Sequence, residues 1–211
     1  MRFQYAVLVI PALCMGCSIG PRDGTAVATQ PAVDRPKDSP VFADPGDRRR
    51  IVYVFDESAA MLQKFSTPKM ELFRAITQLR EDQSFAVVLY TNGANVRVMS
   101  QSLMPATGEN KRLAAAFLEE GSLKGEADPR PALRLAFQMN PDLVYFFSAD
   151  DFDTAEPYGP IGEEIAQLNP AHRVKVHTIL FDVHKERLDL KAAMRKIAAD
   201  NGGTFRDWDE W

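Results

Sequence analysis

Apolar residues gather into short runs from residue 51 onward, and polar turns separate these runs. The runs at 51–55, 85–90 and 143–147 are almost entirely apolar, as in strands that are covered on both faces. The remaining predicted strands are shorter or more mixed in composition: 96–98, 174–181 and an edge strand at 204–205.

Between the predicted strands, apolar residues recur every three or four positions, which is the spacing of one helix face. The first helix is expected to follow Thr67 as its N-cap, with Pro68 in its first turn. Asp128 and Pro129 open a later helix, and Asn-Gly-Gly at 201–203 ends the last one. The apolar positions that define the helices are Leu72, Ile76 and Leu79; Leu113, Ala116 and Phe117; Leu133, Ala136 and Phe137; Ile161, Ile165 and Leu168; and Leu190, Met194 and Ile197.

Strands and helices therefore alternate with short connections. This order predicts an α/β fold with three layers: a doubly wound, mostly parallel sheet with helices on both faces. In such folds ligands bind at the carboxyl ends of the strands. The loops that follow Phe55, Tyr90 and Phe147, together with the loop before Pro129, are the expected place for a site.

The first 16 residues have the features of a signal peptide, with Arg2 ahead of an apolar run too short to span a membrane. Gly16 before Cys17 resembles the bacterial lipobox, and this resemblance implies lipid such as palmitate on Cys17 and cleavage before it. An ordinary signal peptide with a chance cysteine is the alternative. The predicted localisation is the bacterial cell envelope, with the exported chain anchored to a membrane and facing the periplasm or the surface.

Residues 17–49 are rich in Pro, Asp, Gly and Thr, so they are predicted to be a flexible linker before a domain at 50–211. No cysteine follows Cys17, so the domain contains no internal disulfide. The net charge of −4 and the lack of a basic stripe exclude a nucleic-acid partner from the prediction.

Asp56-Glu57-Ser58-Ala59-Ala60-Met61, directly after the first strand, resembles the signature Asp-x-Ser-x-Ser of von Willebrand factor type A (VWA) domains. The order of later segments is similar to that family as well, over roughly residues 50–206. Those segments are 125–129 with the helix that follows, the strand that ends at 148–150, and 201–205.

The resemblance implies a metal-ion-dependent adhesion site, in which hydroxyls and carboxylates from three loops hold Mg²⁺ and a partner's carboxylate completes the shell. Asp56 and Ser58 stand at the first two ligand positions. Alanine, which has no side-chain donor, stands at the other three, and these positions are Ala60, Ala127 and Ala149. The prediction is therefore a degenerate site without a cofactor. The weak residual metal candidates are Asp56, Ser58 and Asp150, which follows Ala149; Asp128 belongs to the same loops.

The predicted function is a membrane-tethered module that binds another protein, without catalysis and without a metal. One alternative is a Mg²⁺-dependent adhesion module in which Asp150 substitutes for the missing aspartate. A second is a hydrolase with Asp56 as nucleophile, but that class needs a carboxylate two residues later, where this chain has Ser58. Acidic residues lie near these loops, among them Glu57 and Asp128. They predict a solvated acidic rim, a surface for a basic partner or a weak Ca²⁺ site.

Overall fold

A central sheet organises the computed structural model, which describes Phe42 and residues 45–58, 66–91, 96–120, 128–149, 159–181 and 188–208. All of these residues fall in one compact unit, 36–211. Two short strands run antiparallel to their neighbour β2, and every other strand pair is parallel. The strands are β1 (Arg50–Asp56), β2 (Ser84–Tyr90), β3 (Val96–Val98), β4 (Met104–Pro105), β5 (Leu143–Ser148), β6 (Lys175–Leu180) and β7 (Phe205–Asp207).

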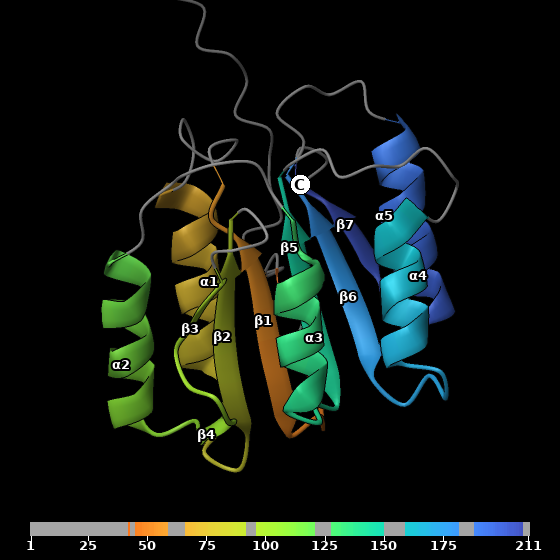
Figure 1. The fold of residues 1–211 in the computed structure, drawn as a ribbon. Helices are drawn as coiled ribbons and strands as arrows, with labels where there is room; N and C mark the ends of the chain where they lie inside the picture. The colour runs from red at the N-terminus through yellow and green to blue at the C-terminus, as the bar shows by residue number, and fades with distance from the viewer. Residues whose placement is uncertain are drawn as a thin grey trace, which may run out of the picture. The chain divides into compact units, whose positions relative to one another are not determined.

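The strand order is β3-β2-β1-β5-β6-β7, with β4 paired to β2 outside this path. β1 lies in the middle because the chain first winds outward through β2 and then crosses to β5 on its other side (Figure 1). This is the doubly wound, mostly parallel sheet that the sequence predicts. The carboxyl ends of β1 and β5, where the order reverses, lie side by side.

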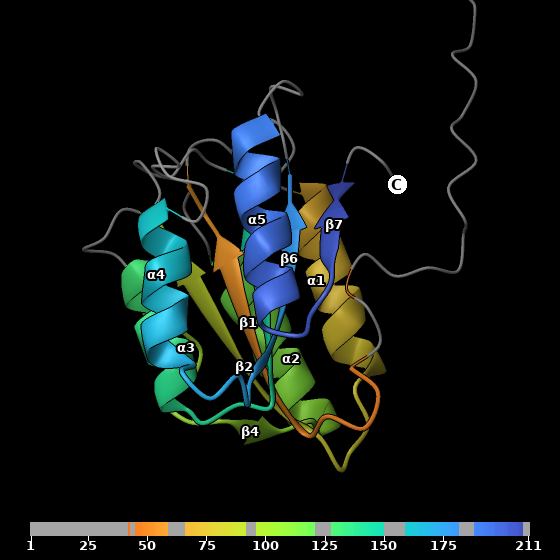
Figure 2. The ribbon, with the colours of Figure 1, turned by 90° about the vertical axis from the view of Figure 1, so that its right-hand side faces the viewer.

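Helices cover both faces of the sheet, as expected for three layers. The helices α1 (Ser66–Gln78) and α2 (Gly108–Glu119) lie on one face. The helices α3 (Arg130–Gln138), α4 (Gly159–Leu168) and α5 (Leu188–Asp200) lie on the other (Figure 2).

Alternate residues of each central strand enter opposite cores, because successive side chains of a strand point to opposite faces. In β1, Tyr53 and Phe55 belong to the core under α1 and α2, whereas Val52 and Val54 belong to the core under α3, α4 and α5. Both sets are fully buried, which explains the uninterrupted apolar run.

Two details of the helices differ from the predictions. Helix α1 begins at Ser66, so Thr67 is already helical instead of capping the helix. In α2 the buried residues are Ala114 and Leu118, while Leu113 is 49% exposed. Residues 113–118 are all apolar, so their spacing does not select one face.

The end of α5 is as predicted. Gly202 has a φ of +64°, the left-handed conformation that terminates helices, and the amide of Gly203 donates to the carbonyl of Ala198. A side chain at Gly203 would overlap the carbonyl oxygen of Val176, so the backbone of this turn lies directly against β6.

Residues near both ends of the described chain cover part of the sheet on the α1 face. Phe42 is 3% exposed and packs edge-on against Tyr53 and Tyr145, with ring centroids 5.7 and 5.6 Å apart. Trp208 packs in the same manner against Phe147 and Phe181. The packed residues thus extend back to Phe42, which lies within the segment predicted to be a linker.

Candidate functional site

The carboxylate of Asp56 is fully buried at the carboxyl end of β1, and both of its oxygens accept backbone hydrogen bonds. Oδ1 accepts from the amide of Ser58 at 2.8 Å, which closes a tight turn directly after the strand. Oδ2 accepts from the amide of Ala149 at 2.9 Å, 93 residues away, at the end of β5. One side chain therefore ties together the loops that follow the two central strands.

Ser58 is also fully buried, and its Oγ atom has no hydrogen-bond partner in the part of the chain that the structure describes. Ala149, 7% exposed, brings a methyl group and its amide to the same place. The structure thus brings together Asp56, Ser58 and Ala149, three of the predicted site residues. Ala60, Ala127 and Asp150 lie outside the described residues, as does Cys17.

Glu57 does not lie on a solvated rim, contrary to one expectation for the acidic residues here. Its carboxylate is 1% exposed and accepts from Nη1 of Arg97 on β3 at 2.8 and 3.0 Å. Nη2 of Arg97 donates to the carbonyl of Phe117 in α2, and its guanidinium lies 4.7 Å from the Phe117 ring centroid. Arg97 therefore neutralises Glu57 and connects the site loop to α2.

Asp128 lies directly before Pro129, which is the N-cap residue of α3, and its side chain binds the first helical residue. Its Oδ1 accepts from the amide of Arg130 at 3.0 Å, and both carboxylate oxygens accept from the Arg130 guanidinium. The hydrogen bonds from Arg130 hold the pKa of Asp128 below its ordinary value. The amide of Asp128 donates to the carbonyl of Thr91, which fixes this loop to the end of β2.

Comparisons with known proteins bear on the fold. No protein-family model and no curated protein matches the sequence. Among solved structures, a von Willebrand factor type A protein from Catenulispora acidiphila is similar, with a TM-score of 0.61 and 20% identity over 75% of this chain. This chain spans only 38% of that protein. The fold is VWA-like.

Two further structures support this conclusion. One is a conserved hypothetical protein, BatB, from Bacteroides thetaiotaomicron, with a TM-score of 0.54 and 14% identity over 75% of this chain and 89% of that one. The other is an aerotolerance-related membrane protein from Bacteroides fragilis, with a TM-score of 0.52 and 12% identity over 75% of this chain and 90% of that one. At these identities the similarity establishes the fold alone.

The resemblance to the VWA signature implies a divalent cation at the loops that Asp56 joins, and the described residues there offer only part of an oxygen shell. A Mg²⁺ site needs hard oxygen ligands at about 2.0–2.1 Å in an octahedron. Both Asp56 oxygens are instead held by amides, and Ala149 offers no oxygen from its side chain. Within the described residues, no group of three or more His, Cys, Asp or Glu side chains is placed to hold a metal.

A second buried polar group of the VWA-like domain was not predicted to have a role. Nδ1 of His177 on β6 accepts from the amide of Thr204 at 3.0 Å, so the neutral ring carries its proton on Nε2. The ring stacks on Tyr145, which stacks on Tyr53. Burial, with the nearby positive charge of Lys175 and Arg206, lowers the pKa of His177 to about 4.

The contacts that sequence reasoning missed join residues far apart in the chain. Glu57 meets Arg97 across 40 residues, and Asp56 meets Ala149 across 93. A partial signal existed for Glu57, because an acid that follows a buried strand in a compact loop needs a cation when it is buried. Which cation supplies this charge depends on the pairing of β3 with β2.

The described helices include none that is long and apolar enough to cross a membrane.

Proposed function

We propose that the chain is a membrane-tethered module that binds another protein and whose strand-end site works without a divalent cation. The observation that carries the proposal is the double hydrogen bonding of Asp56, whose two oxygens accept the amides of Ser58 and Ala149. The two backbone donors already occupy lone pairs of this carboxylate, which leaves fewer of them for a cation. A cation would also lack a side-chain ligand at Ala60, Ala127 and Ala149.

The same geometry favours binding over hydrolysis. An aspartate nucleophile must present an oxygen to the substrate, whereas Asp56 is fully buried and both of its oxygens are engaged. Its immediate neighbour Glu57 is neutralised by Arg97 and is not placed as a general acid or base. We therefore assign no reaction to this site.

The tether belongs to the proposal as well. Lipid on Cys17 would hold the exported chain at a membrane of the cell envelope, and residues 18–41 would separate it from Phe42. A flexible segment of this length has an end-to-end distance on the order of 30 Å. The partner would thus be a protein that lies close to the same membrane.

The metal-free claim is tested by thermal unfolding of the full chain with excess Mg²⁺, with Mn²⁺ and with EDTA. The proposal expects the same Tm in all three conditions, because a ligand that binds only the native state raises the Tm. A rise of Tm with metal that disappears in Asp56→Ala overturns the proposal. The control for the loss of a carboxylate is Asp47→Asn, because Asp47 is exposed. Glu57→Gln would not serve as this control, since it breaks a buried ion pair.

The tether is tested separately by growing cells with radiolabelled palmitate. Label is expected on the wild-type chain and not on Cys17→Ala. An unlabelled wild type, or label that remains on the variant, rejects the anchor and leaves the metal-free claim standing.

One observation favours a second candidate function, a Mg²⁺-dependent adhesion module that uses Asp150. The Oγ of Ser58 is buried without a partner among the described residues, and a metal ligand would satisfy it. Crystals grown with Mn²⁺ and with EDTA distinguish the two candidates. The second requires an octahedral ion bound to Ser58 and Asp150, and the first requires the same hydrogen bonds to Asp56 in both crystals.

A further inference from the structure

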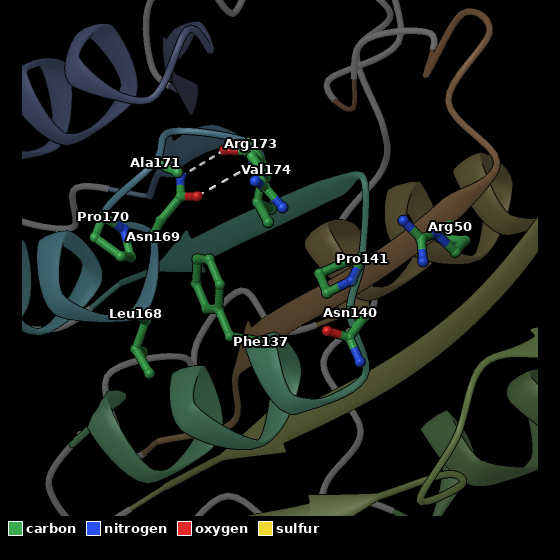
Figure 3. A pocket seen from close by; sticks show the side chains of 10 residues that line it. All are labelled: Arg50, Phe137, Asn140, Pro141, Leu168, Asn169, Pro170, Ala171, Arg173 and Val174. Atoms are coloured by element: carbon green, nitrogen blue, oxygen red, sulfur yellow. Dashed lines mark hydrogen bonds between the residues drawn. The ribbon is translucent and has the colours of Figure 1, made fainter.

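A cavity of about 490 Å³ lies at the amino ends of β1, β5 and β6, at the end of the sheet opposite Asp56. Its volume falls in the range of about 300–1,000 Å³ that is usual for ligand sites. The side chains of Phe137 and Leu168 come from the ends of α3 and α4 and line its apolar part (Figure 3). Pro141, Pro170 and Val174 complete the apolar lining.

Two turns, after α3 and after α4, form part of the cavity wall. The backbone is left-handed at Asn140 and at His172, with φ of 51° and 48°, where the chain turns after α3 and α4. Asn169 fixes the second turn: its Nδ2 donates to the carbonyl of Val174 at 2.7 Å and its Oδ1 accepts the amide of Val174 at 3.1 Å. A ligand therefore binds a preformed site, and binding does not have to order these turns.

The charged groups in the lining are two arginines, and no acidic side chain lines the cavity. Arg50 is already committed, because its Nε and Nη2 donate to Asp142 at 3.1 and 2.7 Å. Arg173 is exposed, and its guanidinium has no hydrogen bond or ion pair within the described ranges. The cavity thus suits an apolar group that is followed or preceded by a carboxylate.

The chain itself carries such a group. Residues 208–211 read Trp-Asp-Glu-Trp. Trp208 is buried at the carboxyl end of β7 between Phe147 and Phe181, so it is not available to a partner. Asp209, Glu210 and Trp211 follow it and combine two carboxylates with an indole.

These three residues cannot reach the cavity of their own chain. The cavity lies at the start of β6, and Trp208 lies level with its end, which for six residues is about 20 Å along the strand. Three extended residues span at most about 11 Å. Trp208 also packs on the α1 face, whereas Phe137 and Leu168 belong to the layer on the other face.

We propose that Asp209, Glu210 and Trp211 of one copy bind in this cavity of a second copy. The indole of Trp211 packs against Phe137 and Leu168, and the carboxylate of Glu210 pairs with Arg173. Because different surfaces of the two copies meet, the contact is head-to-tail and can add further copies in the same direction. The proposal does not rest on the proposed function, since it involves neither Asp56 nor a membrane.

The test is photo-crosslinking of the full chain with p-benzoylphenylalanine in place of Trp211. Isotopically labelled and unlabelled copies are mixed, so mass spectrometry separates links between copies from links within one. The expected product is a dimer linked to Phe137, Leu168 or Val174. Its yield should fall about tenfold in Arg173→Glu, which corresponds to about 1.4 kcal/mol, and should recover when Glu210→Arg is added.

Two controls keep the result interpretable. The exposed Arg74→Glu changes charge equally on α1 and should leave the dimer yield unchanged. The photoreactive residue in place of Leu188, which is 77% exposed, should give no link to the cavity. The proposal is overturned if links form only within one copy, only to other proteins, or between copies at other places. It is also overturned if Arg173→Glu leaves the dimer yield unchanged. Recovery in the double variant excludes misfolding as the cause of the loss.

Discussion

At the scale of single residues, Asp56 joins the loops that follow the two central strands through hydrogen bonds to backbone amides. Each of its oxygens accepts a backbone amide, and those amides belong to the loops after β1 and β5. The fully buried carboxylate accepts hydrogen bonds from polar backbone groups of both loops. The side chain thus has a structural function where the VWA signature implies a metal ligand.

Removing the Asp56 carboxylate should therefore destabilise the domain in the absence of any metal. Asp56→Ala leaves two buried amides without acceptors and should cost about 2–5 kcal/mol of unfolding free energy. Asp56→Asn keeps one acceptor and should cost about 1–3 kcal/mol. Urea unfolding in EDTA measures both, with the exposed Asp47→Asn as control. Losses below those of the control would contradict the assignment.

His177 predicts a pH dependence with a definite sign. Its pKa in the folded state is about 4, below the ordinary value of 6.5, so the unfolded state binds the proton more readily. The contribution of His177 to the free energy of unfolding is fully present above pH 6.5. It is lost as the pH falls from there towards 4. Unfolding free energies measured across this range should show this slope in the wild type. His177→Phe, which keeps a ring on Tyr145, should have a smaller slope, and an equal slope would exclude His177 as the cause.

At the scale of elements, the strand and helix pattern was predicted well and the contacts between elements were not. The apolar runs identify β1, β2 and β5 because strands buried on both faces have no polar alternation. β4 has two residues, which is too short for a periodic pattern, and the sequence did not predict it. The pairing of Glu57 with Arg97 depends on where β3 lies in the sheet, which the sequence of β3 alone does not encode.

That pair should couple the site loop to β3 and α2. Arg97→Met leaves the buried Glu57 carboxylate without its cation and should cost about 3 kcal/mol. Adding Glu57→Gln to Arg97→Met should recover part of the loss, because it removes the buried charge. A double-mutant cycle by chemical denaturation measures the coupling. The exposed pair of Lys196 and Asp200 is the reference, and an equally small coupling for Glu57 and Arg97 would contradict the prediction.

At the scale of the whole molecule, aromatic residues from near both ends of the described chain complete one core. Phe42 covers Tyr53 and Tyr145, and Trp208 covers Phe147 and Phe181. Composition predicted a linker up to residue 49 because a lone Phe in a Pro-rich and Asp-rich segment gives no periodic signal. Phe42, which precedes β1, therefore belongs to the packed core.

Phe42→Ala should lower the unfolding free energy of the domain by about 3 kcal/mol, the cost of emptying an aromatic site in a core. Phe73→Ala on α1 is the matched control, because Phe73 is 37% exposed and its loss should change stability by no more than about 0.5 kcal/mol. Equal effects of the two variants in urea unfolding would mean that Phe42 is not part of the core.

The central claim is that Asp56 binds the two strand-end loops together through the protein's own amides and not through a cation. Titration of the isotopically labelled full chain with Mn²⁺, followed by the amide resonances of Ser58 and Ala149, tests it most directly, because a bound paramagnetic ion broadens nearby signals selectively. We predict that both amide resonances stay as sharp as those of residues at the opposite end of the sheet. Selective loss of the two signals at low Mn²⁺, reversed by excess Mg²⁺, would contradict the claim.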